Sequence, residues 1–204
     1  MIKLAVLLSG SGSTLQNILD QILRQDLDAD VKCVISSREG AFGLERARKH
    51  GLPAITLVRK GFPDFESYND ALWETVRAHE ADLVVLAGFM SLLHVPADYE
   101  HKIINIHPSL IPAFCGQGMY GHHVHEAVLG YGVRLTGATV HFVNEDYDAG
   151  PIILQEAVPV FESDSVETLA ERVQAKEREI YPRAIQLFAS GRLSVEGRIV
   201  RIAP

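Results

Sequence analysis

Short apolar runs alternate with segments of helical periodicity along the first half of the chain. The apolar runs cover residues 4–8, 31–35, 54–57, 83–87 and 103–106. Between them, the spacing of apolar positions predicts helices over residues 15–23, 43–49 and 68–79. Because the runs are continuously apolar rather than alternating, we expect a mainly parallel sheet with helices on both faces. The pattern therefore predicts a Rossmann-like α/β fold.

The pattern changes after residue 121. Residues 135–143 and 152–161 have the length and composition of longer strands, and the sequence Asp148-Ala-Gly-Pro151 between them has the residues of a turn. We expect these strands to form an antiparallel C-terminal extension of the same sheet. No linker rich in Gly, Ser or Pro interrupts the chain, so residues 1–204 are predicted to form a single domain.

The longest helix is expected near the end of the chain. Asp164 and Glu167 have the spacing of a capping box, which predicts that the helix begins there and runs toward residue 190. Glu177 occupies a position within its apolar stripe. Burying an unpaired carboxylate is costly, so we expect Glu177 to form either an internal ion pair or a contact with a ligand.

Composition limits the classes of protein that remain. A hydrophobic fraction of 47% with 22% charged residues is ordinary for a soluble globular enzyme. The net charge of −7 argues against a broad basic surface for nucleic acid. No segment approaches the ~20 apolar residues of a membrane span, and the run at residues 4–8 is too short for a signal peptide. Cys33 and Cys115 have no disulfide-framework spacing, so we expect a cytoplasmic protein with reduced thiols.

An amide and an imidazole stand two residues apart at the end of the fifth apolar run. Side chains alternate along a strand, so Asn105 and His107 are expected to point the same way, and Pro108 ends the strand. Open α/β sheets bind ligands at such carboxyl ends. The pair suits stabilisation of an oxyanion and proton transfer. An isolated pair of this kind is more often a hydrogen-bonded strand end. Other residues are therefore needed to distinguish a catalytic pair from a structural one.

A loop of small residues follows the first strand. In Ser9-Gly-Ser-Gly-Ser-Thr14, glycines let backbone N–H groups approach an anion, and the next helix begins there. The loop lacks the third glycine of a dinucleotide fingerprint and the Gly-Lys-Ser/Thr of a P-loop, which favours a phosphomonoester. The alternative is a loop that only caps the helix.

Asp148 follows a predicted strand, as His107 does. An aspartate near an imidazole favours the protonated ring, so we expect Asp148 to raise the pKa of His107 and to orient it. Alone, an aspartate before Ala-Gly-Pro is more often a turn residue.

Taken together, these motifs resemble the phosphoribosylglycinamide formyltransferase family. The motifs, in order, are Ser9-Gly-Ser-Gly-Ser13, Leu86-Ala-Gly-Phe-Met90, Asn105-Ile-His-Pro-Ser-Leu110, His141-Phe-Val143 and Asp148-Ala-Gly-Pro-Ile-Ile-Leu-Gln155. The resemblance extends through residues 172–182 and so covers nearly the whole chain. The central motif is shared by the wider folate-dependent formyltransferases, while the first loop and the last helix indicate the glycinamide ribonucleotide branch.

The resemblance implies a formyl transfer from 10-formyltetrahydrofolate to the glycine amine of 5'-phosphoribosylglycinamide in de novo purine biosynthesis. It implies that Asn105 and protonated His107 stabilise the oxyanion of a tetrahedral intermediate and that His107 helps return a proton to the folate nitrogen. Asp148 would hold His107 in its charged form and help organise water, with no metal required. It assigns the ribonucleotide to Gly12, Ser13, Thr14 and Glu177. It assigns the folate to Met90, Ser91, Leu92, Leu93, Asn105, Val143 and Asp148.

Several positions depart from the family pattern. Ser91 and Phe65 stand where family members commonly have arginine, so any arginine contribution to folate binding is absent at these positions. Arg59 and Lys60 lie upstream and are candidates to compensate. Thr14 replaces an asparagine found in some members and keeps a hydrogen-bonding side chain.

Three histidines within four positions, His122, His123 and His125, raise an alternative hypothesis of a zinc site. No cysteine pair or HExxH helix accompanies them, so we favour a loop or helix start near the substrate.

Other functions remain as alternatives. Formyltetrahydrofolate deformylase shares the Asn-His-Asp group but passes the formyl group to water. Methionyl-tRNA formyltransferase is disfavoured by the acidic balance and by the expected lack of a further domain. A phosphate-binding module without catalysis would not need Asn105, His107 and Asp148 together. The partners expected are therefore the two small-molecule substrates, without nucleic acid or membrane, and a homodimer is plausible by analogy.

Overall fold

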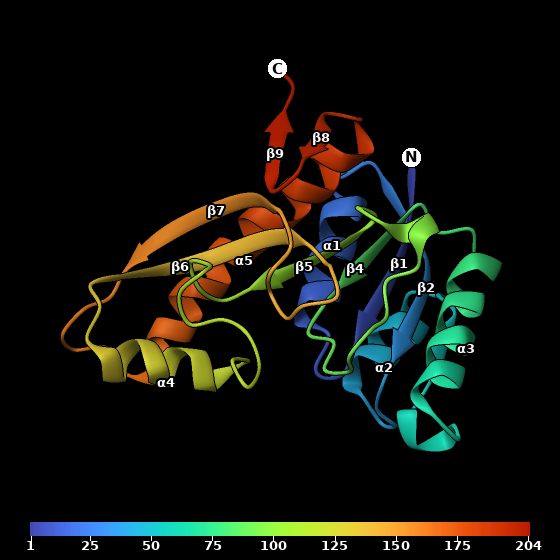
Figure 1. The fold of residues 1–204 in the computed structure, drawn as a ribbon, viewed down its shortest axis with the longest axis horizontal. Helices are drawn as coiled ribbons and strands as arrows, with labels where there is room; N and C mark the ends of the chain where they lie inside the picture. The colour runs from blue at the N-terminus through green and yellow to red at the C-terminus, as the bar shows by residue number, and fades with distance from the viewer. The chain divides into compact units, whose positions relative to one another are not determined.

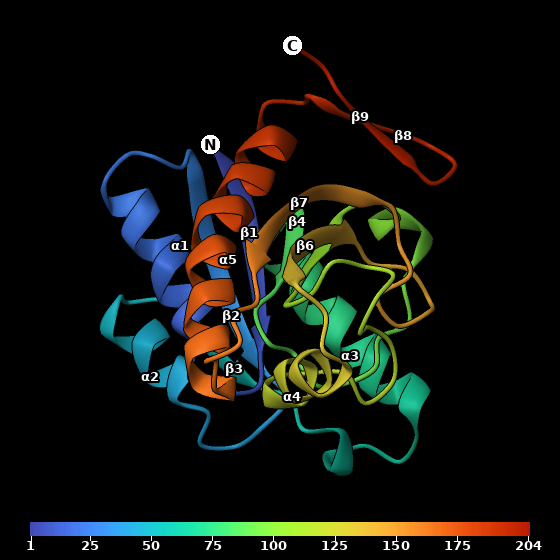
Figure 2. The same ribbon diagram turned by 90° about the vertical axis from the view of Figure 1, so that its left-hand side faces the viewer.

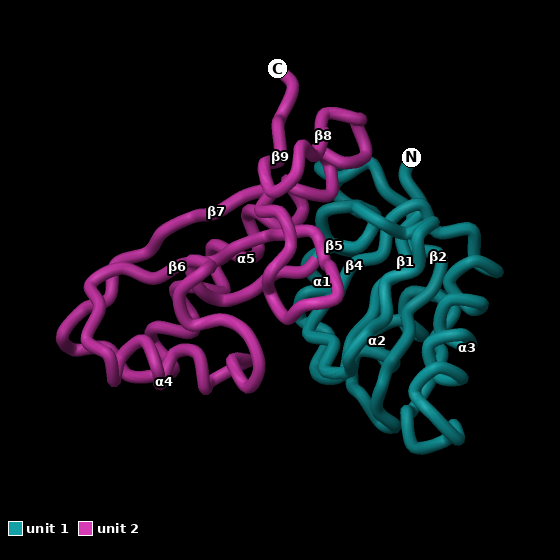
Figure 3. Tube along the Cα trace, viewed as in Figure 1, with its two compact units in different colours: residues 1–104 teal, residues 105–204 magenta.

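The computed structural model describes residues 1–204. Its contacts divide the chain into two compact units, Met1–Ile104 and Asn105–Pro204 (Figure 3). The α/β class, the parallel N-terminal strands and the antiparallel C-terminal strands are all confirmed. The expectation of a single domain over residues 1–204 is not tested by this division and stays a prediction.

The first unit contains the predicted parallel strands, in the order β3-β2-β1-β4 (Figure 1). These are β1 (Ile2–Leu8), β2 (Ala29–Ser36), β3 (Ala54–Thr56) and β4 (Leu83–Leu86). The helices are α1 (Ser13–Leu23), α2 (Phe42–Lys49) and α3 (Phe65–Ala78), with 3-10 turns η1 (Arg59–Gly61) and η2 (Ala97–Tyr99). Helices α1 and α2 lie on one side of the strands and α3 on the other, so both faces are covered (Figure 2).

The apolar runs form the core of this unit. Residues 4–8 of β1 and residues 83–85 of β4 have no exposed surface. Helix α1 buries Leu15 and Ile18 fully, and α3 buries Tyr68 and Leu72 fully. Each such aliphatic side chain contributes roughly 1.5–3 kcal/mol relative to an exposed one. This packing fixes the carboxyl end of β1, where the loop of small residues begins.

Strand β5 (Ile103–His107) begins in the first unit and ends in the second. The second unit continues with α4 (His122–Tyr131), β6 (Leu135–Phe142), β7 (Ile152–Pro159), α5 (Val166–Ala189), β8 (Leu193–Glu196) and β9 (Ile199–Ile202). Strands β6 and β7 are antiparallel as predicted, and α5 packs against both of them and against α4.

The β8–β9 hairpin was not expected from the sequence. The two strands are antiparallel, and β9 also pairs with β7 through Ile199 and Ile152. The hairpin extends beyond the C-terminal end of α5 (Figure 2). Each strand has only four residues and is largely exposed, so no apolar run marks it.

The predicted cap of α5 is wrong by one residue. Ser165, not Asp164, caps the helix, and its capping-box partner is Thr168 rather than Glu167. Asp164 instead binds the guanidinium of Arg172 at 2.7 Å, which holds the pKa of its carboxyl far below the usual range. None of the helices has the length and apolar character needed to cross a membrane.

Candidate active site

The predicted catalytic residues come together in the second unit. Strand β5 ends with the side chains of Asn105 and His107, and His107 is only 3% exposed. Asp148 contacts both of them, although it lies in the loop between β6 and β7. The expectation that these three side chains form one cluster is therefore confirmed by their geometry; their catalytic roles remain predictions.

Both nitrogens of the His107 ring face an oxygen atom. Nε2 lies 2.8 Å from the backbone carbonyl of Phe114, and a carbonyl can only accept, so Nε2 carries a hydrogen. Nδ1 lies 3.4 Å from Oδ2 of Asp148. A second proton on the ring would therefore lie between Nδ1 and the carboxylate.

Asp148 raises the pKa of His107 as expected, but the expected net increase is wrong. Burial lowers the pKa of His107, and this effect outweighs the opposing effects of the Asp148 carboxylate and the Phe114 carbonyl. A buried imidazolium loses its hydration, which one carboxylate at this distance does not fully replace. The free site thus favours a neutral His107 ring near neutral pH.

Asp148 is held in its ionised form. Burial alone would raise its pKa, but His141, His107 and the backbone N–H of Gly116 together lower it. The Gly116 N–H donates to Oδ2 at 3.0 Å. Asp148 also has a backbone φ of 52°, a left-handed conformation that is unusual for a residue other than glycine. Such strain is often found where a side chain must be aimed at a functional site.

The structure adds His141 to the cluster. Its Nδ1 lies 2.8 Å from the Phe142 carbonyl, which can only accept, so Nδ1 carries a hydrogen, and its Nε2 lies 3.6 Å from Oδ1 of Asp148. The Asn105 amide nitrogen lies 3.3 Å from that Nε2 and 3.4 Å from Oδ1 of Asp148. The Asn105 amide nitrogen therefore has two polar neighbours within the cluster.

His141 lies within one of the family motifs but was not predicted as a site residue. A signal was present, because a histidine in a strand that is expected to be buried must satisfy its polar atoms. His141 is 2% exposed in β6.

The loop after β5 is fixed by side chains of β6 and β7. The Thr139 hydroxyl donates to the Ser109 carbonyl at 2.7 Å and accepts the Ile111 N–H at 3.2 Å. The Gln155 amide donates to the Ile111 carbonyl and to the Thr139 hydroxyl, each at 2.9 Å. These contacts fix the loop that carries Phe114, and with it the acceptor for His107.

A close backbone contact positions the loop that carries Asp148. A Cβ atom on Gly150 would lie 1.7 Å from the Phe142 carbonyl oxygen. The Phe142 N–H also donates to the Pro151 carbonyl at 2.9 Å. Glycine is therefore required at position 150 for the loop to pack against the end of β6, next to His141.

In the first unit, the loop predicted to bind phosphate leads into α1. Gly12 is the N-cap, has φ of 70° and provides no side-chain cap. The first N–H groups of a helix have no intrahelical partner, so this end of α1 can receive an anion. Helix α2 supports the loop, because Gly43 donates to the Gly10 carbonyl at 3.1 Å and Arg46 donates to the Ser11 carbonyl at 2.9 Å. Arg46 also adds positive charge beside the loop and was not identified from the sequence.

The predicted folate segment, residues 90–93, follows β4 in the same unit. Met90 is 42% exposed and Leu92 43% exposed, whereas Leu93 is buried. Phe65, which stands where an arginine is common in the family, is 36% exposed at the start of α3. The segment therefore presents apolar side chains and backbone groups rather than positive charge.

Glu177 has no ionic partner in the structure. Burial raises its pKa from 4.5 to about 7, and the opposing effect of Arg178 is smaller. Of the two expectations for this residue, the internal ion pair is not present. The ligand contact remains a prediction, and it would explain why an unfavourable carboxylate occupies this position.

Replacing Glu177 with glutamine is expected to stabilise the protein at pH 8 relative to the wild type. The folded-state pKa lies above the unfolded value, so folding takes up a proton between about pH 4.5 and 7 and stability falls as pH rises through this window. The full shift corresponds to on the order of 3 kcal/mol, which glutamine would remove. Urea unfolding at pH 5 and pH 8 measures this, and an equal effect of the substitution at both pH values would contradict it.

The histidines of α4 do not gather into a metal site. His125 is buried, whereas His122 and His123 are exposed, and His123 lies 3.4 Å from Glu126. No group of three or more His, Cys, Asp or Glu side chains is arranged to hold a metal ion in residues 1–204. The zinc hypothesis gains no support from this arrangement.

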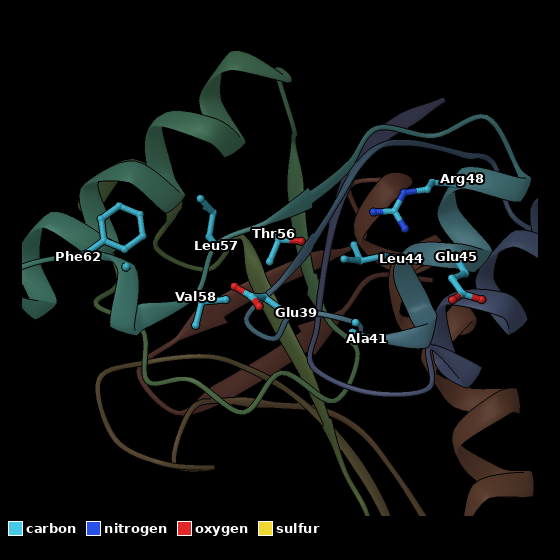
Figure 4. Close-up of a pocket in the computed structure, with 11 residues that line it drawn as sticks. Glu39, Ala41, Leu44, Glu45, Arg48, Thr56, Leu57, Val58 and Phe62 are labelled. Atoms are coloured by element: carbon cyan, nitrogen blue, oxygen red, sulfur yellow. The ribbon is translucent and has the colours of Figure 1, made fainter.

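A cavity of about 430 Å³ lies elsewhere in the first unit (Figure 4). It is bordered by residues 39–48 on one side and by residues 56–62 on the other, with Glu39, Arg48 and Phe62 among its lining side chains. None of the predicted site residues lines it. It is therefore separate from the proposed chemistry.

The α/β fold holds an amide, an imidazole and a carboxylate together at the end of β5, an arrangement suited to stabilising negative charge and to moving a proton. Comparison with known sequences identifies the family. The sequence model of the formyl transferase family matches residues 2–185, and the chain belongs to that family.

Individual relatives agree with this assignment. The phosphoribosylglycinamide formyltransferase of Escherichia coli is 42% identical over 196 residues, which cover 95% of this chain and 90% of that protein. The trifunctional purine biosynthetic protein adenosine-3 of Bos taurus is 45% identical over 201 residues, or 97% of this chain. This chain spans only 19% of the length of that trifunctional relative.

Solved structures show the same fold. Glycinamide ribonucleotide transformylase 1 from Symbiobacterium toebii has a TM-score of 0.94 and 47% identity, with 100% of this chain and 95% of that chain covered. A formyltetrahydrofolate deformylase from Pseudomonas syringae has a TM-score of 0.87 at 29% identity, and the match covers 66% of that chain. The deformylase is thus less similar in sequence than the transformylase, and the match covers a smaller share of the deformylase chain.

Proposed function

We propose that the protein transfers the formyl group of 10-formyltetrahydrofolate to the glycine amine of 5'-phosphoribosylglycinamide, as a step of purine biosynthesis in the cytoplasm. The observation that carries the proposal is the cluster in which Asp148 contacts both Asn105 and His107. The names of the Escherichia coli and Bos taurus relatives support the substrate and the pathway.

The chemistry follows from the groups in the cluster. The substrate amine attacks the formyl carbon, a carbon–nitrogen bond forms, and the carbonyl oxygen becomes an oxyanion. The Asn105 amide donates a hydrogen bond to that oxygen, as a fixed donor does most effectively in a buried site. The bond from the formyl carbon to N10 of the folate then breaks, and that nitrogen receives a proton.

The neutral state of the His107 ring suits this sequence. A neutral ring can accept a proton only at Nδ1, which faces Asp148 Oδ2, so the proton that the attacking amine releases passes to the ring by way of that carboxylate, and the imidazolium forms as the oxyanion forms. Asp148 Oδ2, 3.4 Å from Nδ1, stabilises that cation. The proton then returns by the same route to the leaving nitrogen. Proton transfer of this kind typically contributes roughly 10² to 10⁴ in rate.

Other residues bind the two substrates in this proposal. Gly12, Ser13 and Thr14 bind the ribonucleotide phosphate, supported by the uncapped N-terminus of α1. Glu177 contacts the ribose or glycinamide portion. The folate is assigned to Met90, Ser91, Leu92, Leu93, Asn105, Val143 and Asp148, with backbone groups contributing where Ser91 replaces an arginine.

The decisive assay supplies 10-formyltetrahydrofolate with and without 5'-phosphoribosylglycinamide and follows the release of tetrahydrofolate. Release that depends on the ribonucleotide, together with formation of the formylated ribonucleotide, is the expected result. Release at the same rate without the ribonucleotide would contradict the proposal and indicate a deformylase.

A further inference from the structure

Ser9 joins three segments of the first unit at the carboxyl ends of their strands. It follows the last residue of β1 and is 4% exposed. Its hydroxyl lies 2.5 Å from that of Ser37, the first residue after β2. The same hydroxyl accepts the Met90 N–H at 2.8 Å, and the Ser9 N–H donates to the Gly88 carbonyl at 3.0 Å.

The Ser9 hydroxyl has a fixed role toward Met90, whereas either hydroxyl can donate in its contact with Ser37. A backbone N–H can only donate, so the Ser9 oxygen is the acceptor for Met90. Its remaining lone pair and its hydrogen are available to Ser37. Ser37 is 7% exposed, and its own N–H donates to the Leu8 carbonyl at 3.1 Å, which keeps it beside Ser9. The Ser37 contact thus orients the hydroxyl on which Met90 depends.

Ser9 fixes one end of the segment that follows β4, and α3 fixes the other end. Asn69 of α3 accepts the His94 N–H at 2.9 Å, and Trp73 of α3 donates to the His94 carbonyl at 2.8 Å. Residues 91–93 therefore lie between two anchored ends. The Ser9 end includes Gly88, whose φ of 74° favours glycine and gives the turn its direction.

We propose that Ser9 is a positioning residue that sets the conformation of residues 88–93 for folate binding. The proposal rests on the proposed function, because that function assigns Met90 to Leu93 to the folate. Ser9 is also the first residue of the loop of small residues, but its hydroxyl forms hydrogen bonds with residues 37 and 90 and not with that loop. Removing the hydroxyl should therefore weaken folate binding more than ribonucleotide binding.

The test compares Ser9→Ala, Ser9→Thr and Ser36→Ala. Ser36 provides a matched control, because it is a fully buried serine whose hydroxyl bonds only to the backbone of Arg38. For Ser9→Ala we expect the Kd for tetrahydrofolate and the KM for 10-formyltetrahydrofolate to rise about tenfold, the effect of leaving one N–H without its acceptor. The KM for the ribonucleotide should change less than about twofold. Ser9→Thr, which keeps the hydroxyl, should restore most of the folate affinity.

Hydrogen–deuterium exchange measures the contact without reference to activity. Amides in a peptide covering residues 87–93 should exchange faster in Ser9→Ala than in the wild type or in Ser36→Ala. If Ser9→Ala does not fold, Ser37→Ala removes the partner that orients the Ser9 hydroxyl. It should raise the Kd for tetrahydrofolate and speed exchange at residues 87–93, by less than Ser9→Ala would.

The outcomes separate this proposal from the proposed function. A wild-type protein without ribonucleotide-dependent folate release would contradict the function, whatever Ser9 does. An active wild type in which Ser9→Ala raises both KM values equally, or behaves like Ser36→Ala, would overturn the role of Ser9. Faster exchange at residues 87–93 without any change in tetrahydrofolate binding would also overturn it.

Discussion

Replacing Asp148 with asparagine is expected to lower kcat by roughly 10² to 10⁴, with little change in the KM for the ribonucleotide. Asparagine has the same shape, so the loss reports the charge. The carboxylate opposes the effect of burial on the pKa of His107, and without it that pKa falls further. The acid limb of the kcat profile should accordingly move to lower pH.

Steady-state kinetics over a range of pH, with formylated product measured directly, test this expectation. Asp146→Asn is the matched control, because Asp146 lies two residues away on the same loop and is exposed. It should keep near-normal kcat. A similar kcat for Asp148→Asn and Asp146→Asn at every pH would show that Asp148 does not support proton transfer.

Replacing Gly150 with alanine is expected to destabilise the protein by about 3 kcal/mol or more. The new Cβ would lie 1.7 Å from the Phe142 carbonyl oxygen, so the backbone itself must move. That carbonyl also accepts the Nδ1–H of His141, at 2.8 Å. Any movement would therefore displace His141 and Asp148, and kcat should fall even where the variant remains folded.

Urea or thermal unfolding, followed by kinetics below the unfolding transition, provides the measurement. Gly130→Ala is the control, because Gly130 lies in α4 and an alanine Cβ there would meet no neighbouring atom within 4 Å. Alanine at this position should be neutral or stabilise the helix by roughly 0.5–1 kcal/mol. Equal stability of Gly150→Ala and the wild type would mean that the loop does not require glycine.

The main strands and helices could be predicted because burial and sequence pattern agree in them. Strand β1 is apolar at every core position, and its fully buried residues are those of the predicted run. The β8–β9 hairpin could not be predicted in this way, since its pairing rather than its burial defines it. At α5, Asp164 and Ser165 are both good caps by residue type, and the bond of Asp164 to Arg172 decides between them.

The site was partly predictable for a similar reason. Strand alternation is enough to place Asn105 and His107 on one side of β5. The balance between burial and charge at His107 depends on how much protein surrounds the ring, and no local motif encodes that. The same limit applies to His141, whose partners Asn105 and Asp148 are distant in sequence.

The Asn105 amide has a consequence for the energetics of the reaction. In the free protein its nitrogen lies 3.3 Å from His141 Nε2 and 3.4 Å from Asp148 Oδ1, so the amide already solvates a negative charge. In the proposed reaction an oxyanion would take over a donor that a carboxylate has held, and Asn105 would exchange partners rather than gain one. Its stabilising effect is then the difference between two hydrogen bonds. The hydrogen bond from the Asn105 amide nitrogen to Asp148 Oδ1 is long, at 3.4 Å in the free protein, and long hydrogen bonds are weak. The amide therefore loses little when it changes partner.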